Sequence, residues 1–233
     1  MGRRVNPKPL ELGEDWDWLI ILDACRYDYF KKLWNKSRVE PRLSPGSCTL
    51  EFLDWMPRIP DSIVVTSHPF VLDRKDKFTE VVDAGFDDEL NTCPPWFISR
   101  SLRNRYGHVL GYKHKILWFL QPHHPLIAEP RVDVGIFTNP RTRELTPQAR
   151  TTLMYMKAKA RGILSKAYEA NLRIVLSELE KILPLMRGKI IITSDHGEGL
   201  GEPLRPQDKP VFSHPCAREE WEVRLVPFTV LTR

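Results

Sequence analysis

The chain has 233 residues, 42% of them hydrophobic and 28% charged, a composition that excludes a disordered or low-complexity protein and suits one α/β domain. No apolar run approaches the ~20 residues that a membrane-spanning helix needs, so no membrane span is expected. The formal net charge of +5 fits an anionic substrate, but also weak affinity for nucleic acid or a membrane surface.

The termini and the cysteines set further expectations. Residues 1–15 are polar and interrupted by prolines, which predicts a surface arm on a single domain that spans residues 1–233; they contain no apolar segment typical of a signal peptide. The cysteines lie far apart, without CxxC spacing, which argues against a structural zinc site and predicts a reducing, cytoplasmic location. The four are Cys25, Cys48, Cys93 and Cys216.

The first strong signal is WDWLIILD at residues 16–23, a buried strand that ends in an aspartate. Residues 24–34 follow with helical spacing, so Asp23 lies at a strand-to-helix junction. An aspartate there can cap the helix, or it can contribute to a metal site at the carboxyl edge of a parallel sheet. This segment alone leaves both interpretations open.

Residues 47–53, SCTLEFL, place small polar side chains at the start of an amphipathic helix. The local interpretation is helix capping, to which Glu51 contributes. The functional interpretation is a nucleophile at a helix N-terminus, where unpaired N–H groups favour an incoming phosphate or sulfate.

Residues 61–67 and 115–120 predict two further strands, with a helix at residues 94–105 between them. The second strand runs into QPHHP, in which His123 and His124 stand between prolines. A single histidine is more often structural, but a rigid pair at a third strand end favours a functional site.

A helix in two parts around Gly162, over residues 151–186, leads to GKIIITSDHGEGLGE at residues 188–202. Ile190, Ile191 and Ile192 predict a strand that is buried on both faces. Asp195 and His196 follow it, either as part of a polar loop or as a ligand pair for a divalent metal ion.

Three glycines after His196 allow sharp turns beside the predicted site: Gly197, Gly199 and Gly201. The chain ends with FSHP at residues 212–215 and a last strand at residues 224–231, in which Pro227 predicts a bulge or a sheet edge.

Taken in order, ILDACRYD, SCTLEF, QPHHP, TSDHGE and FSHP resemble the motifs of the alkaline phosphatase superfamily, specifically of its sulfatase-like branch. The likeness extends from about Trp18 to Phe228, and SDHGE is its most specific part. The resemblance implies a three-layer α/β/α sandwich around a mostly parallel sheet, with the active site at the carboxyl ends of the strands.

The resemblance also implies roles for individual residues. Thr49 would be the nucleophile, His123 would contact the ester or assist the leaving group, and His214 would face the substrate anion. One divalent ion, zinc, manganese, calcium or magnesium, would be the cofactor. Its four implied ligands are Asp23, Thr49, Asp195 and His196.

The chain departs from the pattern of the superfamily in three ways. Residues 48–52 lack the CxPSR motif of sulfatases, so formylglycine chemistry is not expected. The segment that begins at Gln121 has no Asp-x-x-x-His pair, which favours one metal over two. The interval from Asp23 to Thr49 is short, so the nucleophile stays open among Thr49, Ser47 and Cys48; Thr49 is favoured because it fits a helix start.

The function expected from these observations is metal-dependent hydrolysis of phosphate or sulfate esters through a covalent Thr-linked intermediate. One alternative is a transferase that moves a phospho-headgroup at the same site, and another is an inactive member that binds an anion or a partner. The expected substrate is a small anionic ester, with specificity shaped by residues 70–112 and 126–148. No nucleic-acid partner is expected, and the oligomeric state is left open.

Overall fold

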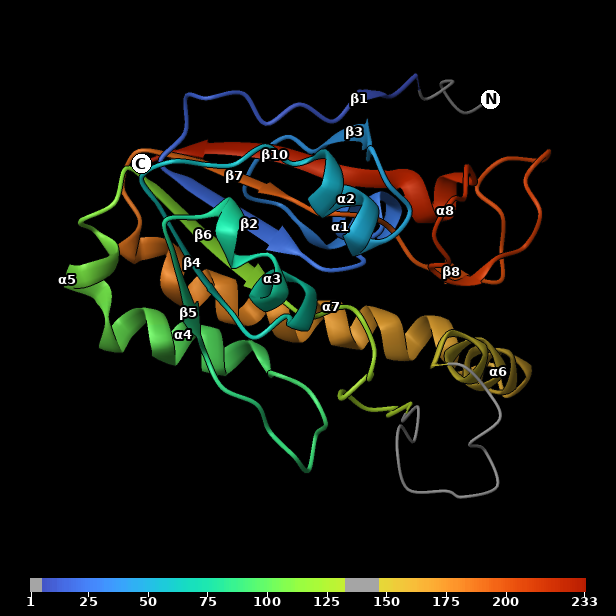
Figure 1. The fold of residues 1–233 in the computed structure, drawn as a ribbon. Coiled ribbons are helices and arrows are strands. Elements are labelled where there is room, and N and C mark those ends of the chain that lie inside the picture. Colours follow the sequence, from blue (N-terminus) through green and yellow to red (C-terminus); the bar gives the residue numbers. More distant parts are fainter. Residues whose placement is uncertain (1–5, 133–146) are drawn as a thin grey trace.

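Eight strands form one mixed sheet in the computed structural model, which describes residues 6–132 and 147–233 (Figure 1). All of them run in one direction except β10, which is antiparallel to both of its neighbours. Across the sheet the order is β1 (Lys8–Pro9), β3 (Glu40–Leu43), β10 (Leu225–Thr232), β7 (Lys189–Thr193), β2 (Trp18–Leu22), β6 (His114–Phe119), β4 (Ser62–Thr66) and β5 (Glu80–Asp83).

The central strands carry apolar side chains on both faces, because both faces are covered. Every residue of β2, β4 and β6 is buried. Trp18, Ile20 and Leu22 of β2 enter one hydrophobic core, whereas Leu19 and Ile21 enter another on the opposite face. This alternation divides the molecule into three layers.

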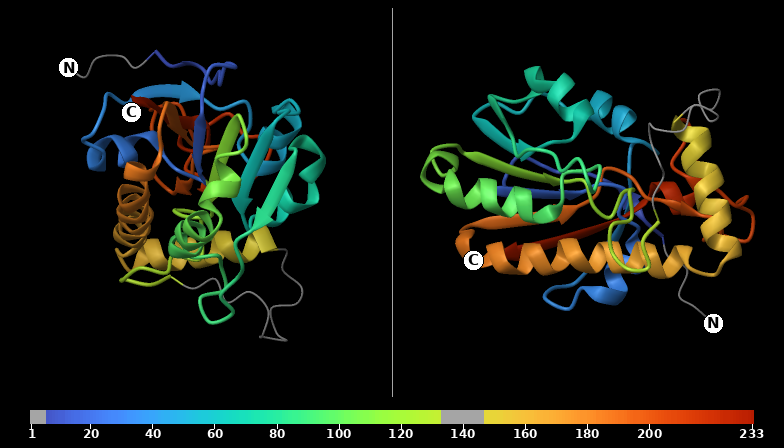
Figure 2. Two further views of the ribbon diagram at one scale, coloured as in Figure 1. Left: turned by 90° about the vertical axis from the view of Figure 1, so that its left-hand side faces the viewer. Right: turned by 90° about the horizontal axis from the view of Figure 1, so that it is seen from below.

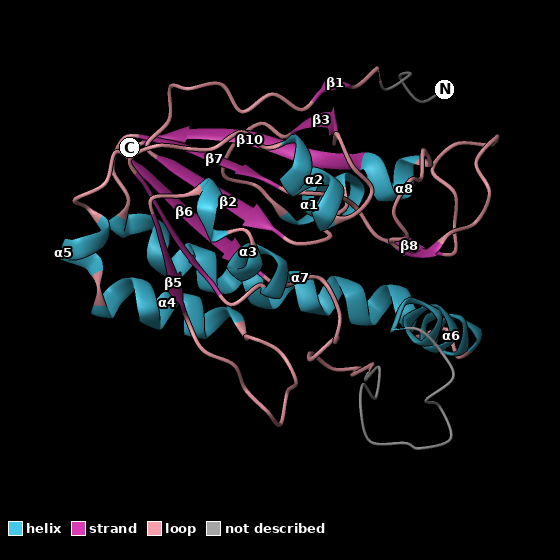
Figure 3. Cartoon of the chain, viewed as in Figure 1, coloured by secondary structure: helices cyan, strands magenta, loops and turns pink. Residues whose placement is uncertain are grey.

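Helices form the two outer layers (Figures 2 and 3). On one face the core includes side chains of α1 (Tyr27–Leu33), α4 (Pro95–Asn104) and α7 (Leu164–Ile182). On the other it includes side chains of α2 (Thr49–Trp55) and α3 (Pro69–Asp73). The predicted α/β/α sandwich around a mostly parallel sheet is therefore confirmed.

The remaining helical segments are short or lie outside these layers. The described part also contains α5 (Tyr106–Val109), α6 (Pro147–Ala160), α8 (Trp221–Arg224) and the 3-10 turns η1 (Lys75–Lys77) and η3 (Leu183–Leu185). The predicted break at Gly162 is present between α6 and α7, where this glycine has a φ of +70°. No helix in the two described ranges is long and apolar enough to cross a bilayer.

The described part of the N-terminal segment is mostly exposed, but it also pairs with the sheet. Within its described part, β1 pairs in parallel with β3 and Leu10 is buried in a core. The segment therefore closes one edge of the sheet. Periodicity could not indicate this, because a two-residue strand is defined by its partner and not by its own pattern.

Of the two alternatives predicted for Pro227, the sheet edge is wrong, because β10 lies inside the sheet between β3 and β7. Pro227 stands opposite Pro41 of β3, and pairing with β7 begins one residue later, at Phe228 and Thr193. Proline has no backbone N–H to donate to a neighbouring strand. Pro227 fits inside the sheet because it faces another proline on β3 and precedes the residues that pair with β7.

A second, two-stranded sheet lies after β7. Its strands, β8 (Gly199–Leu200) and β9 (Phe212–Ser213), are antiparallel, with Gly199 opposite Ser213. The pairing brings the segment after β9 back to the carboxyl end of β7. Residues from both ends of this loop therefore enter the same site.

Candidate active site

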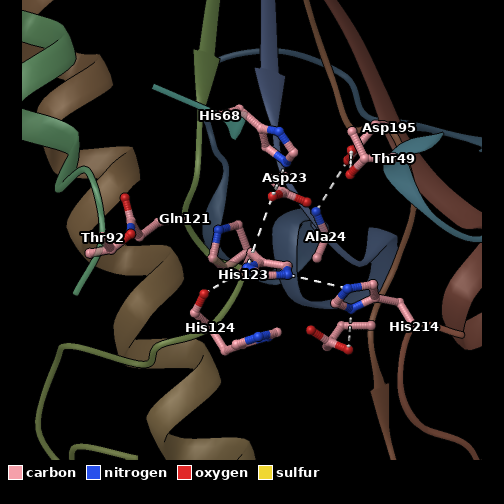
Figure 4. A network of polar contacts seen from close by, with 12 residues as sticks. Asp23, Ala24, Thr49, His68, Thr92, Gln121, His123, His124, Asp195 and His214 are labelled. Carbon is pink, nitrogen blue, oxygen red and sulfur yellow. Dashed lines mark hydrogen bonds and ion pairs between the residues drawn. The ribbon is translucent and has the colours of Figure 1, made fainter. Parts of the chain in front are cut away.

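Four neighbouring parallel strands, β7, β2, β6 and β4, end at the same edge of the sheet. A short polar segment follows each of them, and Figure 4 shows their side chains converging at this edge. The carboxyl edge of an open α/β sheet is where such folds place their ligands. The site is built from the first polar residues after these strands.

The turn after β2 is held by buried hydrogen bonds. Ala24 has a φ of +58°, and its carbonyl accepts a 2.6 Å hydrogen bond from the Tyr168 hydroxyl. The Cys25 N–H donates to Ser194 Oγ at 2.8 Å, which ties this turn to the end of β7. These bonds fix Asp23 beside Asp195.

Four residues form what we call the carboxylate cluster: Asp23, Thr49, Asp195 and His196. The Thr49 hydroxyl donates to Asp195 Oδ2 at 2.8 Å and lies 3.2 Å from His196 Nε2. His196 Nε2 lies 3.3 Å from Asp23 Oδ1. The structure thus brings together all four residues that the resemblance implies as metal ligands, although they come from three separate segments.

The carboxylate cluster has the donor set of a divalent cation site. Asp23 is 1% exposed, yet neither of its carboxylate oxygens accepts a hydrogen bond from the described residues. His196 Nδ1 donates to the Gly197 carbonyl at 2.8 Å, so in the neutral imidazole the lone pair is on Nε2 and is directed at the carboxylates. Buried carboxylates without partners are costly, and a bound cation satisfies them.

Electrostatics distinguishes the members of the carboxylate cluster. Burial acts to lower the pKa of His196, but the carboxylates of Asp195 and Asp23 outweigh it and raise the pKa to about 9. Burial acts to raise the pKa of Asp23, but His123 and close contacts with His196 and His68 hold it well below its ordinary value. The cluster therefore favours positive charge at its centre.

A second group, the histidine cluster, consists of His123, His124 and His214 and faces the carboxylate cluster. His123 Nε2 lies 3.2 Å from His214 Nε2, and His214 Nδ1 lies 3.0 Å from Glu198 Oε1. Glu198 is buried and accepts a 3.2 Å hydrogen bond from the Tyr155 hydroxyl.

The hydrogen bonds of the histidine cluster define where its protons lie. His123 Nδ1 donates to the His124 carbonyl at 2.6 Å, so Nε2 of a neutral His123 is an acceptor. The contact between the two Nε2 atoms then requires a proton on His214 Nε2. A neutral His214 with that proton accepts at Nδ1, so it is the protonated form of Glu198 that donates to it.

The pKa shifts agree with this arrangement of protons. Burial raises the pKa of Glu198 to about 7. Burial, with the positive charge of His196, lowers the pKa of His214 to about 3. Burial likewise lowers the pKa of His123. The histidine cluster is therefore neutral, with one exchangeable proton shared between Glu198 and His214.

Both clusters border a cavity of about 460 Å³. Asp23, Thr49, His123 and His214 reach it, whereas Asp195 and His196 do not line it and are fully buried. Its outer lining includes three apolar side chains that remain substantially exposed: Leu50 (37%), Phe70 (41%) and Phe86 (51%). A polar floor and an apolar rim thus form one pocket.

The three nucleophile candidates have different surroundings. Of the three, only Thr49 contacts Asp195. Ser47 Oγ donates instead to Glu51 and to the Pro215 carbonyl. Cys48 forms a disulfide with Cys216, so its sulfur is not a free thiol.

This disulfide removes one ground for the expected reducing location. The expectation rested on sequence spacing, and the two residues lie 168 positions apart. Since a disulfide is typical of oxidising surroundings, the cysteines no longer support a reducing compartment, and the cytoplasmic location is a prediction without that support.

Two residues of the site, His68 and Glu198, were not among the predicted site residues. His68 follows the end of β4, is buried and lines the cavity, with Nε2 3.2 Å from Asp23 Oδ2. Its signal is the one that identified His123, a histidine next to a proline after a buried strand. Of the segments predicted to shape specificity, residues 133–146 lie outside the described residues.

The glycines after His196 serve two purposes. A Cβ at Gly197 would lie 2.2 Å from the Glu222 carbonyl oxygen, so only glycine allows α8 to pack against the site loop. Gly201 has a φ of +78°, which glycine adopts readily. Close packing, as well as turning, therefore explains this glycine-rich loop.

Solved structures with the same fold provide a comparison. The soluble domain of lipooligosaccharide phosphoethanolamine transferase A from Neisseria meningitidis superposes with a TM-score of 0.62 at 13% identity, over 97% of this chain and 78% of that one. The periplasmic domain of EcEptC from Escherichia coli, in complex with Zn, gives 0.59 at 11%, over 97% and 77%.

A third match is an alkaline phosphatase superfamily protein from Vibrio parahaemolyticus, with a TM-score of 0.52 at 9% identity, over 95% of this chain and 61% of that one. No family model and no curated protein sequence matches this chain. At these identities the likeness establishes the fold. The chain has the fold of the alkaline phosphatase superfamily, as its motifs indicated.

Proposed function

We propose that this protein is a metal-dependent enzyme that cleaves phosphate or sulfate esters through a covalent intermediate on Thr49. The observation that carries the proposal is the position of the Thr49 hydroxyl, which borders the cavity and donates to Asp195 beside the unpartnered carboxylate of Asp23. The fold supports it, because a similar domain from Escherichia coli forms a complex with Zn.

The residues of this chain suit the roles that such a metal site requires. A divalent ion held by the carboxylate cluster would lower the pKa of the Thr49 hydroxyl and draw charge from the ester oxygens. Imidazole and carboxylate ligands together suit zinc or manganese better than calcium or magnesium. His196 is oriented for this purpose by its hydrogen bond to the Gly197 carbonyl.

In the first step, the Thr49 oxygen attacks the phosphorus or sulfur atom of the bound ester. Its proton leaves along the 2.8 Å hydrogen bond to Asp195 Oδ2. The bond from phosphorus or sulfur to the leaving oxygen breaks, and that oxygen takes a proton from the histidine cluster, which Glu198 replenishes through His214. In the second step, water attacks the phosphorus or sulfur atom and gives a proton back to the histidine cluster, the bond to the Thr49 oxygen breaks, and Thr49 recovers its proton from Asp195.

A second candidate is transfer of the bound group to an alcohol in place of water. The apolar rim of Leu50, Phe70 and Phe86 favours it, because a hydrophobic acceptor or donor could lie there while its ester group reaches Thr49. The similar structures include a lipooligosaccharide phosphoethanolamine transferase. Adding alcohol acceptors and measuring the ratio of transfer to hydrolysis products separates the two candidates.

The proposal is tested with purified protein loaded with zinc or manganese. We expect turnover of an aryl phosphate, an aryl phosphodiester or an aryl sulfate, loss of turnover after chelation, and recovery on metal addition. Thr49→Ala should abolish turnover while one metal ion per chain is retained. Turnover that survives both Thr49→Ala and Asp195→Ala contradicts the proposal.

A further inference from the structure

The disulfide between Cys48 and Cys216 joins two parts of the catalytic site. Cys48 is the residue before α2, directly before Thr49, and Cys216 lies two residues after His214. Both cysteines line the cavity. The bond therefore links the backbone that carries the proposed nucleophile to the loop that carries the proton-handling histidine.

The loop of Cys216 makes other contacts with the start of α2. The Ser47 hydroxyl donates to the Pro215 carbonyl at 2.9 Å and accepts from the Arg218 N–H at 3.0 Å. The Ala217 N–H donates to Glu51 Oε1 at 2.6 Å. These hydrogen bonds hold residues 214–218 against the start of α2. The disulfide adds a covalent link between the same two segments.

The backbone of this loop does not hold its conformation unaided. Ser213 and Ala217 have φ values of +62° and +58°, in a region that residues with a side chain rarely adopt. No regular element is present between β9 and α8. Such a loop keeps its shape only while its attachments constrain it, and the disulfide is its one covalent attachment to another part of the described chain.

We propose that the Cys48–Cys216 disulfide is a positioning element of the active site. It fixes the positions of Thr49 and His214 relative to each other and makes catalysis depend on the redox state of this bond. The proposal rests on the proposed function, since it concerns the reaction at Thr49. A displacement of about 1 Å in a reacting group can lower a rate about a hundredfold, so loss of the cross-link should lower the rate of the chemical step.

The bond is accessible to a reductant, because Cys216 is exposed. With a water-soluble trialkylphosphine, the phosphorus attacks one sulfur and the S–S bond breaks. Water then supplies the oxygen of the phosphine oxide and the protons of the two thiols. The other two cysteines, Cys25 and Cys93, are free and buried. Reduction therefore acts on one known bond.

The experiment compares the native protein, Cys48→Ala/Cys216→Ala and the matched control Cys93→Ala, each loaded with metal. Peptide mapping of the unreduced native protein should find residues 48 and 216 in one cross-linked fragment. Phosphine treatment should lower kcat of the native protein and of Cys93→Ala about tenfold to a hundredfold. The double variant should have the low kcat from the start and not respond to phosphine.

Metal content and circular dichroism separate positioning from loss of structure, and both should stay unchanged at the assay temperature. An unchanged kcat in the reduced protein and the double variant overturns the inference but leaves the proposed function intact. Free thiols at both positions in unreduced protein also overturn it. If the oxidised native protein has no metal-dependent turnover on any ester, the proposed function itself has failed.

Discussion

The carboxylate cluster and the histidine cluster lie at the same sheet edge, and their imidazoles are buried or partly buried, yet the two environments shift the pKa values of these rings in opposite directions. The pKa of His196 is raised to about 9, because two carboxylates adjoin its ring. The pKa of His214 is lowered to about 3, because it is buried near the positive charge of His196. Neighbouring charges outweigh burial in the first case and add to it in the second.

This difference in charge indicates different roles for the two clusters. The carboxylate cluster, at the cavity floor, offers a cation negative charge and Asp23 oxygens that accept no hydrogen bond from the described residues. The histidine cluster is neutral, borders the cavity and holds a proton between Glu198 and His214. Substitution of Asp23, Asp195 or His196 should therefore remove metal, and substitutions in the histidine cluster should change proton transfer while metal remains.

The largest expected effect follows Asp195→Asn. It removes the charge that holds both the cation and the Thr49 hydroxyl, so bound metal should be lost and kcat/KM should fall at least about a thousandfold, or roughly 4 kcal/mol. Metal content after dialysis and steady-state kinetics measure the two effects. Asp28→Asn is the matched control, since Asp28 pairs with Arg26 and is partly exposed. Retention of one metal ion by Asp195→Asn would refute this part of the account.

A smaller loss is expected for His214→Gln, which removes an imidazole but no proposed metal ligand. Metal content should stay at one ion per chain, while kcat falls about a hundredfold for an alkyl ester. The loss should be smaller for a nitrophenyl ester, whose leaving oxygen needs no proton. His108→Gln, at an exposed histidine paired with Glu80, is the control. Equal losses for both esters would argue against a role in leaving-group protonation.

The dependence of metal affinity on pH sharpens the contrast between the clusters. The pKa of His196 is about 9 in the metal-free protein, so below pH 9 a proton must leave before Nε2 can bind a cation. Affinity should therefore rise about tenfold per pH unit from pH 7 to 9 and then level off. The pKa of His214, at about 3, adds no dependence in this range. Competition titrations against a chelator of known pH dependence measure the slope, and a flat profile would contradict the assignment.

The smallest effect concerns Glu198, which orients and protonates His214. Glu198→Ala should lower kcat about tenfold to a hundredfold without loss of metal. Glu198→Gln should lose less, because its amide N–H can donate to His214 Nδ1 in place of the carboxylic acid. Glu202→Gln, at a partly exposed carboxylate that pairs with Arg26, is the control. An equal loss in the Ala and Gln variants would remove the protonated Glu198 from the mechanism.

The sequence predicted the sheet and most of the candidate site because both follow from local patterns. Buried parallel strands are apolar throughout, and their carboxyl ends meet, so Asp23, His123 and Asp195 could be expected to converge. The same rule applied to β4 would have included His68. Short strands such as β3 and β5 were not predicted, because prolines or charged residues interrupt the apolar pattern of a strand. Pairing with neighbouring strands stabilises them.

Other features depend on contacts between distant segments. The partners of Cys48 and Glu198 lie on the loop after β9, and no spacing or periodicity indicates how that loop returns to the site. The choice of Thr49 over Ser47 likewise depended on which side chain faces Asp195 at the start of α2. Tertiary structure, not local propensity, determines these parts.

The central claim is that Thr49 carries the transferred group, and its most direct test is to trap that intermediate. Metal-loaded protein is mixed with an aryl phosphate or sulfate that supports turnover, quenched in acid during the steady state, digested and analysed by tandem mass spectrometry. The account predicts a phosphoryl or sulfuryl group on Thr49, absent from Thr49→Ala. The same group on Ser47 or another residue, or turnover without any covalent adduct in rapidly quenched samples, would contradict it.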